Sequence, residues 1–140
     1  MSNIRKHLQR LRDHEKKEAR LRLAKAEIEQ ERQAARLEAN NAEIEAARES
    51  HNHDDPAEVA RYHAFRLRME MVRRREEQKL TRANEKVDVR RDALNEKVRE
   101  SRTLETLIER SEEEAAQEMR RQEASLLDEL GLMGWSRKIA

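Results

Sequence analysis

His51-Asn52-His53-Asp54-Asp55-Pro56 is the stretch that interrupts an otherwise continuous helical sequence. It contains the only proline among 140 residues, and neither of the two glycines lies near it. Asp55 is suited to cap a helix N-terminus, Pro56 fits the first helical position, and Glu58 stands where a capping-box acid belongs. The stretch therefore predicts a short turn between two long helices.

The composition is that of a long helix rather than a globular core. Charged residues make up 44% of the chain, aromatic residues 2%, and the net charge is only +1. Disordered chains are also polar, but they usually carry a large net charge and contain many Pro, Gly and Ser residues, whereas this chain consists mainly of strong helix formers with almost no Gly, Pro or Ser clusters. We therefore expect an all-α fold, an elongated antiparallel two-helix coiled-coil hairpin that forms a single domain over residues 1–140.

The proline, the glycines and the turn residues also predict where the helices end. The first helix is expected from about Asn3 to about Ser50, the turn over 51–55, and the second helix from Pro56 to about Leu130. Gly131 is a plausible C-cap, so 131–140 is expected to be a tail. At 1.5 Å per residue the first helix covers the second to about residue 103, and the rest of the second helix has no partner in its own chain.

Seven-residue spacing predicts the faces that pack together. On the second helix the predicted seam contains Leu80, Val87, Leu94, Ser101, Ile108 and Ala115. On the first helix a stripe starts with Ile4, Leu8 and Leu11 and continues through Leu21, Ile28, Ala35 and Ala42, with Leu23, Leu37 and Ile44 beside it.

Catalytic, cofactor and membrane functions are not supported by the sequence. There is no cysteine and no glycine-rich phosphate loop, and a two-helix hairpin offers no enclosed pocket. No apolar run approaches the roughly 20 residues of a membrane span, and the N-terminus lacks the apolar stretch of a secretory signal. We expect a non-enzymatic, soluble, cytoplasmic protein without a cofactor.

Two charged clusters are better explained as polar surface. His51, His53, Asp54 and Asp55 have the ligand types of a zinc or nickel site, but a polar turn that caps the next helix accounts for every one of them. The arginine run 73–75 suggests nucleic-acid binding, yet two glutamates follow at once and stacking aromatics are missing. We therefore expect neither a metal site nor a nucleic-acid partner.

Two apolar surfaces are candidates for protein partners. Near the turn, Tyr62, Phe65, Met69 and Val72 form a stripe that holds two of the three aromatics, and such residues are typical interface anchors. The alternative is that some of them pack on Leu37, Ile44 and Ala47 and hold the turn together. At the far end, residues 106–130 carry eight acidic and three basic residues, whereas residues 1–25 carry nine basic and three acidic residues. These unneutralised charges, with the apolar tail around Trp135, suggest that another molecule completes this end. The alternative is that water and salt screen the exposed charges.

The chain resembles the flagellar export protein FliJ family and the related YscO group of type III secretion stalk proteins. The resemblance rests on Arg61-Tyr62-His63-Ala64-Phe65 at the start of the second helix, on Asn84-Glu85-Lys86-Val87-Asp88, and on the charged stretch that leads to Leu127-Asp128-Glu129. It covers mainly residues 56–130, and the length near 140 residues agrees with it.

The resemblance implies a central stalk that sits in a hexameric export ATPase, promotes its assembly or activity and couples it to the FlhA-type export gate. The location would be the cytoplasmic face of the inner-membrane export apparatus, and export chaperones are further partners that the family binds. The gate would meet Tyr62, Phe65, Met69, Val72 and Glu76. The ATPase ring would meet both ends of the chain, through Ile4, Leu8, Leu11, Met119, Leu126, Leu127 and Leu130.

A generic coiled-coil adaptor, or a scaffold that homodimerises through the uncovered end of the second helix, is the alternative interpretation. Mass in solution separates the two, because a monomer favours the stalk and a tight dimer favours the scaffold. An arginine-rich nucleic-acid binder is a third and weaker hypothesis. The sequence does not separate a flagellar from an injectisome system.

Overall fold

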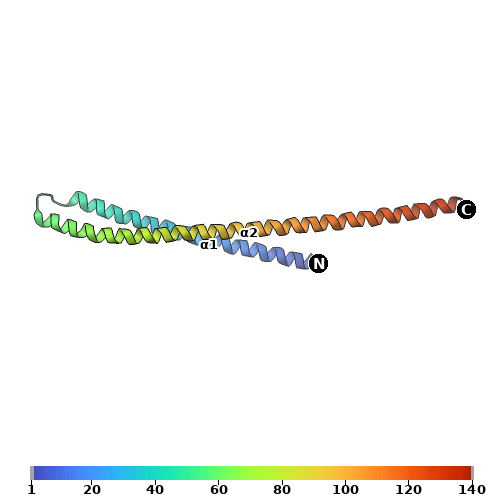
Figure 1. Cartoon of the computed structure of the whole chain (residues 1–140), viewed down its shortest axis with the longest axis horizontal. Helices are drawn as coiled ribbons and strands as arrows, with labels where there is room; N and C mark the ends of the chain where they lie inside the picture. Colours follow the sequence, from blue (N-terminus) through green and yellow to red (C-terminus); the bar gives the residue numbers. More distant parts are fainter. Residues whose placement is uncertain (1, 140) are drawn as a thin grey trace. The chain divides into compact units, whose positions relative to one another are not determined.

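The computed structural model describes residues 2–139 and contains two long helices in this range. Helix α1 runs over Ser2–Ser50 and helix α2 over Pro56–Ile139 (Figure 1). The prediction of an all-α two-helix hairpin is confirmed. The predicted turn is also confirmed, because residues 51–55 are the only non-helical segment between residues 2 and 139.

The turn is held by local hydrogen bonds that its sequence provides. Asp55 caps α2 as predicted, because its Oδ1 accepts a hydrogen bond from Ala57 N at 3.0 Å. Glu58 does not close a capping box onto the backbone of Asp55. Its carboxylate instead accepts a hydrogen bond from Asn52 N at 2.9 Å, and Asn52 Oδ1 accepts one from Asp54 N at 3.0 Å. The acid therefore ties α2 back to the start of the turn.

Helix α2 does not end at Gly131, so the predicted C-cap is wrong, and so is the predicted tail over 131–139; residue 140 lies outside the described residues. The helix continues to Ile139, and neither glycine has a positive φ. A glycine ends a helix when it adopts the left-handed conformation, whereas a helical glycine costs only about 1 kcal/mol relative to alanine. The surrounding Leu, Met and Trp side chains permit the helix to continue through both positions.

Contacts within the chain divide it into two units, and the expected single domain stays a prediction. One unit spans His14–Lys97 and contains the turn; the other comprises the residues up to Asp13 together with those from Val98 onward. In the turn-containing unit, α1 and α2 run antiparallel. Three contacts between the helices are Gln33 with Glu76, Glu29 with Lys86 at 3.2 Å and Glu15 with Lys97 at 3.4 Å.

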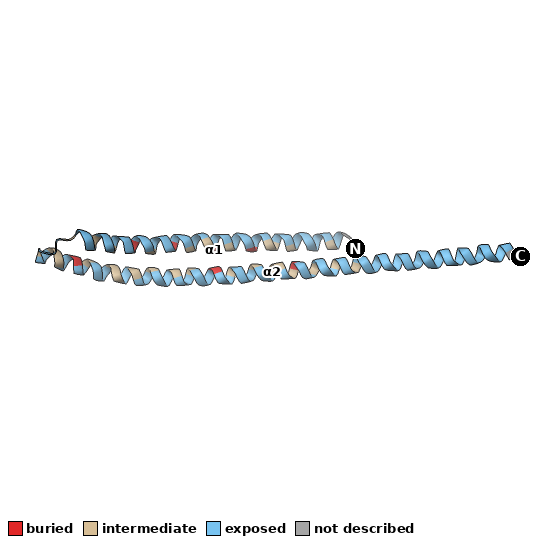
Figure 2. Cartoon of the chain, turned by 90° about the horizontal axis from the view of Figure 1, so that it is seen from above, coloured by how far each residue is buried: buried red, intermediate tan, exposed pale blue. Residues whose placement is uncertain are grey.

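The seam of the turn-containing unit follows a strict seven-residue repeat but is unusually polar. On α1 the buried residues are Ala19, Ala26, Gln33 and Asn40. On α2 they are Tyr62 and Val87, with Leu80 and Leu94 half-buried one heptad either side of Val87. Figure 2 shows these buried positions on the facing sides of the helices. Two of the four buried α1 positions are amides, so burial here removes little apolar surface from water.

The predicted α1 stripe is wrong, because its larger residues face solvent. Leu21 is 64% exposed and Ile28 48% exposed, whereas the flanking Leu23, Leu37 and Ile44 are half-buried. The exposed stripe and the actual seam lie on opposite sides of the same helix. The α2 row through Leu80, Val87 and Leu94 is confirmed as a seam, and Ser101 and Ile108 on the same row are buried and half-buried. Ala115, the last predicted member of the row, is exposed, so that part of the prediction is wrong.

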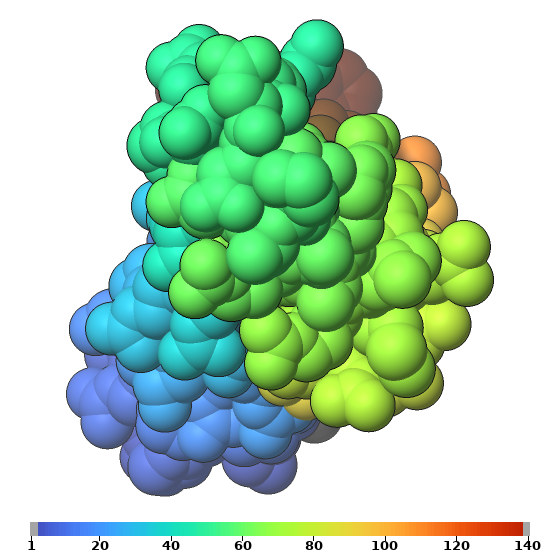
Figure 3. Space-filling view, turned by 90° about the vertical axis from the view of Figure 1, so that its left-hand side faces the viewer, coloured from blue at the N-terminus to red at the C-terminus, as the bar shows by residue number. Residues whose placement is uncertain are grey.

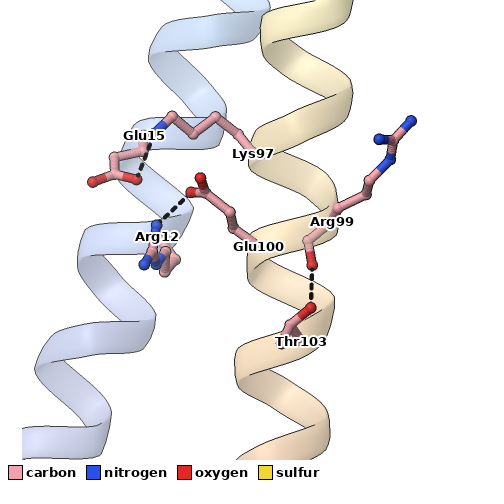
Figure 4. A network of polar contacts seen from close by, with 6 residues as sticks. All are labelled: Arg12, Glu15, Lys97, Arg99, Glu100 and Thr103. Carbon is pink, nitrogen blue, oxygen red and sulfur yellow. Dashed lines mark hydrogen bonds and ion pairs between the residues drawn. The ribbon is translucent and has the colours of Figure 1, made fainter.

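The second unit pairs the start of α1 with α2 mainly through polar contacts. Arg12 Nη1 lies 2.5 Å from Glu100 Oε2, and Arg5 Nη2 donates a hydrogen bond to Ser111 Oγ at 2.6 Å. Figure 4 shows the Arg12 contact, and also Thr103 Oγ1 donating to the carbonyl of Arg99 at 3.0 Å. Ile4, Leu8 and Leu11 are exposed and do not start a seam.

Contacts between α1 and α2 in this unit reach Ser111, which is further along α2 than the predicted limit near residue 103. Helix side chains lean toward their own N-terminus, and the long Arg5 side chain therefore reaches further along α2 than a count of backbone positions suggests. Beyond this contact, every residue from Glu112 to Lys138 is exposed, as the uniform pale blue of this segment in Figure 2 shows.

Candidate partner-binding surfaces

Tyr62 belongs to the packing of the turn and is not an exposed anchor. Its ring is 8% exposed and stacks on the imidazole of His51, with centroids 4.1 Å apart and planes 4° apart. His53 contacts the same imidazole edge-on at 4.0 Å. The turn residues are seen in green in Figure 3, which views the molecule from the end that carries the turn. The aromatic group therefore holds the hairpin closed.

The rest of the predicted turn-proximal stripe is only partly accessible. Phe65 and Met69 are half-buried, and Val72 is 38% exposed. Phe65 contributes to a shallow hollow of about 340 Å³ beside the turn. The other residues that line this hollow are Ala47, Ser50, His51, Glu58, Arg61 and Tyr62. A partner could reach the edge of Phe65 in this hollow.

Glu76 is already engaged inside the hairpin, so its assignment to the gate stays a prediction. Its carboxylate accepts a short hydrogen bond from the Gln33 amide and lies 3.4 Å from Lys79 Nζ. The Gln33 hydrogen bond, followed by Lys79, lowers the pKa of Glu76 below its usual value. Glu76 shares a heptad row with Tyr62 and Met69, and that row faces α1.

The most exposed apolar residues near the turn were missed by the sequence analysis. Leu67 is 71% exposed and Met71 60% exposed, and their four-residue spacing places them on one face of α2. With the neighbouring Val72 they form what we call the tip face. Arg68 and Arg75 are exposed beside it. The i, i+4 spacing of Leu67 and Met71 indicates a shared helix face, whereas the nearby aromatic residues lie on the seam side of α2.

The exposed end of α2, Glu112–Lys138, carries a narrow apolar stripe. Met119, Leu126, Leu130 and Met133 recur at steps of three, four or seven residues and are 55–62% exposed. Leu127 is 67% exposed beside the stripe, and Leu132 is 67% exposed on the opposite side of the helix. Nothing in this unit covers the stripe among the residues that the structure describes, so it is available to another molecule.

The chemical alternatives gain no support from the geometry. Within residues 2–139 no group of three His, Asp or Glu side chains is arranged to hold a metal ion. Over the same range neither helix has a stretch long and apolar enough to cross a membrane. Arg73, the first residue of the arginine run, pairs with Glu70 and lies 3.9 Å from Glu77, so its charge is already balanced.

Comparison with known proteins agrees with the resemblance stated above. A family model described as "Flagellar FliJ protein" matches residues 6–140. No curated protein and no solved structure matches the chain significantly. The match covers nearly the whole chain, including the tip face and the exposed end of α2.

Proposed function

Because the chain belongs to the flagellar FliJ protein family, we propose that it is the non-enzymatic central stalk of a protein-export ATPase complex. In this role it inserts into a hexameric export ATPase, promotes assembly or activity of the ring, and links the ring to an FlhA-type export gate. Its place is the cytoplasmic face of the inner-membrane export apparatus. Export chaperones are further candidate partners.

The uncovered segment Glu112–Lys138 is the observation that carries this proposal. It is a long helix with an apolar stripe and an acidic surface, and it has no partner within its unit. A helix of this kind is stabilised by inserting its stripe between subunits of a protein ring. Ile4, Leu8 and Leu11 are exposed in the same unit and provide a second apolar contact for the ring.

The mechanical role follows from asymmetry. A single helical stalk cannot present the same side chains to six equivalent subunits, so it stabilises one conformation in some subunits and another in the rest. Such a bias requires contacts that favour one subunit conformation over the other. The stripe of Met119, Leu126 and Leu130 supplies apolar contacts on one side of the helix only.

The turn-containing unit is proposed to meet the export gate. The tip face, with Phe65, offers apolar side chains interspersed with the exposed Arg68 and Arg75. Tyr62 stabilises the adjacent turn through its packing on His51. The gate surface that fits is an apolar groove with an acidic rim.

ATP hydrolysis by the cognate export ATPase, titrated with the full chain at physiological salt, tests the ring contact. We expect the rate to rise and to saturate near one stalk per hexamer. Leu126→Ser with Leu130→Ser should reduce the activation strongly, because both side chains lie on the stripe. Leu132→Ser is the matched control, since Leu132 is equally exposed on the other side of the helix. Equal activation by all three proteins would refute the ring contact.

Binding of the isolated gate domain tests the tip face. Leu67→Ser with Met71→Ser should weaken binding about tenfold or more, since exposed anchors of this kind contribute about 1–2 kcal/mol each. Val89→Ser is the control, because Val89 is 63% exposed on the same helix away from the turn. Unchanged affinity in the double variant, with helicity intact, would remove the tip face from the proposal.

A further inference from the structure

The solvent side of α1 carries an ordered stripe that the hairpin does not use. Lys17, Leu21, Ala24, Ile28 and Glu31 follow one another at steps of three and four residues, so they lie along one face of the helix. All five are exposed, and all belong to the turn-containing unit. The seam residues Ala19, Ala26 and Gln33 lie on the opposite face.

This stripe is complementary to its own reversed copy. Read toward the C-terminus it is basic, leucine, alanine, isoleucine, acidic; read backward it is acidic, isoleucine, alanine, leucine, basic. The flanking charges are inverted in the same way. On either side of Ala24, Glu18 corresponds to Arg32 and Arg20 corresponds to Glu27, so the signs are opposite. A two-fold axis produces this relation between two copies of one surface.

We propose that a second copy of the chain docks on this stripe, with the two α1 helices antiparallel and the two-fold axis near Ala24. Leu21 then packs against Ile28 of the second copy. Lys17 meets Glu31 of the second copy, and Glu18 meets Arg32 of the second copy. Each pairing occurs twice, since the interface is isologous.

The charged side chains at the two ends of the stripe support a second copy of the chain as its partner. Within residues 2–139 neither Lys17 nor Glu31 takes part in an ion pair or a side-chain hydrogen bond, so both charges are free for an intermolecular partner. The large apolar side chains on the stripe are few, which predicts a weak and reversible dimer rather than an obligate one. The stripe differs from both surfaces proposed for export, so its failure would leave that proposal intact.

Sedimentation velocity of the full chain, up to about millimolar concentration at low and at high salt, tests the dimer. We expect a salt-sensitive dimer that Leu21→Ser with Ile28→Ser abolishes. Lys17→Glu alone and Glu31→Lys alone should each weaken it about tenfold, because two like-charge pairs replace two opposite ones. An equimolar mixture of the two variants should form a heterodimer of wild-type strength.

Arg102→Glu is the matched charge reversal, since Arg102 is exposed on α2 outside this unit. It should leave self-association unchanged. A chain that stays monomeric at every concentration would overturn the proposal. So would a dimer that tolerates the Leu21 and Ile28 changes, or single variants whose mixture is no stronger than either alone.

Site-directed cross-linking tests the antiparallel geometry independently, because the chain has no cysteine of its own. Ala24→Cys lies at the proposed axis, and a short bis-maleimide should link it to its symmetry mate efficiently. Ala42→Cys is equally exposed but would be about 50 Å from its mate at 1.5 Å per residue, so it should not be linked. Efficient linking at position 42, or none at position 24, would contradict the antiparallel arrangement.

Discussion

The imidazole of His51 and the phenol ring of Tyr62 are nearly parallel, 4° apart in plane and 4.1 Å apart between centroids. His51 is the first residue after α1, and Tyr62 lies on the second turn of α2. The pair therefore connects the two helices directly at the turn. Tyr62 is also the only buried aromatic residue among those that the structure describes.

Replacing Tyr62 by alanine should destabilise the hairpin by about 2 kcal/mol, since burial of a large side chain contributes about that amount. The change should appear as a lower urea midpoint in far-UV circular dichroism. Tyr62→Phe keeps the ring and should be nearly neutral. If both variants lost the same stability, the hydroxyl rather than the stacked ring would be the stabilising group.

Asn40 should be the seam position at which an apolar substitution stabilises the chain. Its side chain is 7% exposed, and neither its Nδ2 nor its Oδ1 has a hydrogen-bond partner. Asn40→Leu should raise stability by about 1 kcal/mol, because it removes an unsatisfied buried amide. Asn41→Leu is the matched control, since Asn41 is exposed next to it and should gain nothing.

The same pair of variants shows whether Asn40 also favours pairing within the chain over self-association. Asn40 lies eleven residues before His51, and Arg73 lies eleven residues after Tyr62. Because His51 stacks on Tyr62, antiparallel pairing places Asn40 opposite Arg73. Arg73 Nε also lacks a hydrogen-bond partner. A buried polar residue in a coiled coil commonly selects one pairing at a cost in stability. A stabilised Asn40→Leu variant with a higher molar mass in solution would show that role, and a molar mass that stays that of the wild type would exclude it.

Stability should depend on pH through Glu76. Because its pKa is lowered in the folded chain, chiefly by the Gln33 hydrogen bond, the ionised carboxylate stabilises the hairpin above the unfolded pKa of about 4.3. This contribution is lost as the pH falls through the lower folded pKa. The melting temperature of Glu76→Gln should therefore lie below that of the wild type at pH 7, and the gap should close at acidic pH.

Glu38→Gln is the control for this titration, because Glu38 is exposed on α1. Its melting temperature should follow that of the wild type at every pH. A gap for Glu76→Gln that stayed constant between pH 7 and pH 3 would mean that the carboxylate charge does not contribute through this hydrogen bond.

The two helical glycines should limit the order of the end of α2. A Cβ added at Gly131 or Gly134 would meet no atom within 4 Å, and both positions have ordinary helical φ. The double variant Gly131→Ala with Gly134→Ala should gain up to about 1 kcal/mol of helix stability per site. Increased helicity and slower proteolysis after residue 130 are the expected readouts. Decreased helicity would instead indicate a helix end at Gly131.

The sequence was sufficient for the turn, the helical hairpin and the α2 seam, because these depend on Asp55, Pro56 and a row with Leu80, Val87 and Leu94. It was not sufficient for the α1 seam. Ala19, Gln33 and Asn40 carry almost no hydrophobic signal, so the stronger Leu21 and Ile28 were assigned inward. Contacts with α2 and the geometry of the turn decide which face of α1 is buried. The periodicity of α1 alone carries no information about these contacts.

The accessible tip residues Leu67 and Met71 could not be predicted for a related reason. Aromatic residues near a turn suit a partner surface and turn packing equally well, and only the position of His51 decides that Tyr62 packs inside. Because Tyr62 packs against α1, Met69 and Glu76 on the same heptad row also face α1. Leu67 and Met71 therefore face solvent. Their role depends on the registry between helices rather than on composition.

The hydrogen bonds of the turn have a consequence for the order in which the hairpin folds. Glu58 and Asn52 are separated by six positions, whereas Gln33 with Glu76 and Glu29 with Lys86 close loops of 43 and 57. Loop-closure entropy therefore favours the turn as nucleus, from which the pairing propagates outward like a zipper. Since the polar seam adds little stability at each step, substitutions within residues 51–62 should change the folding rate, while those near Glu15 and Lys97 should change mainly the unfolding rate.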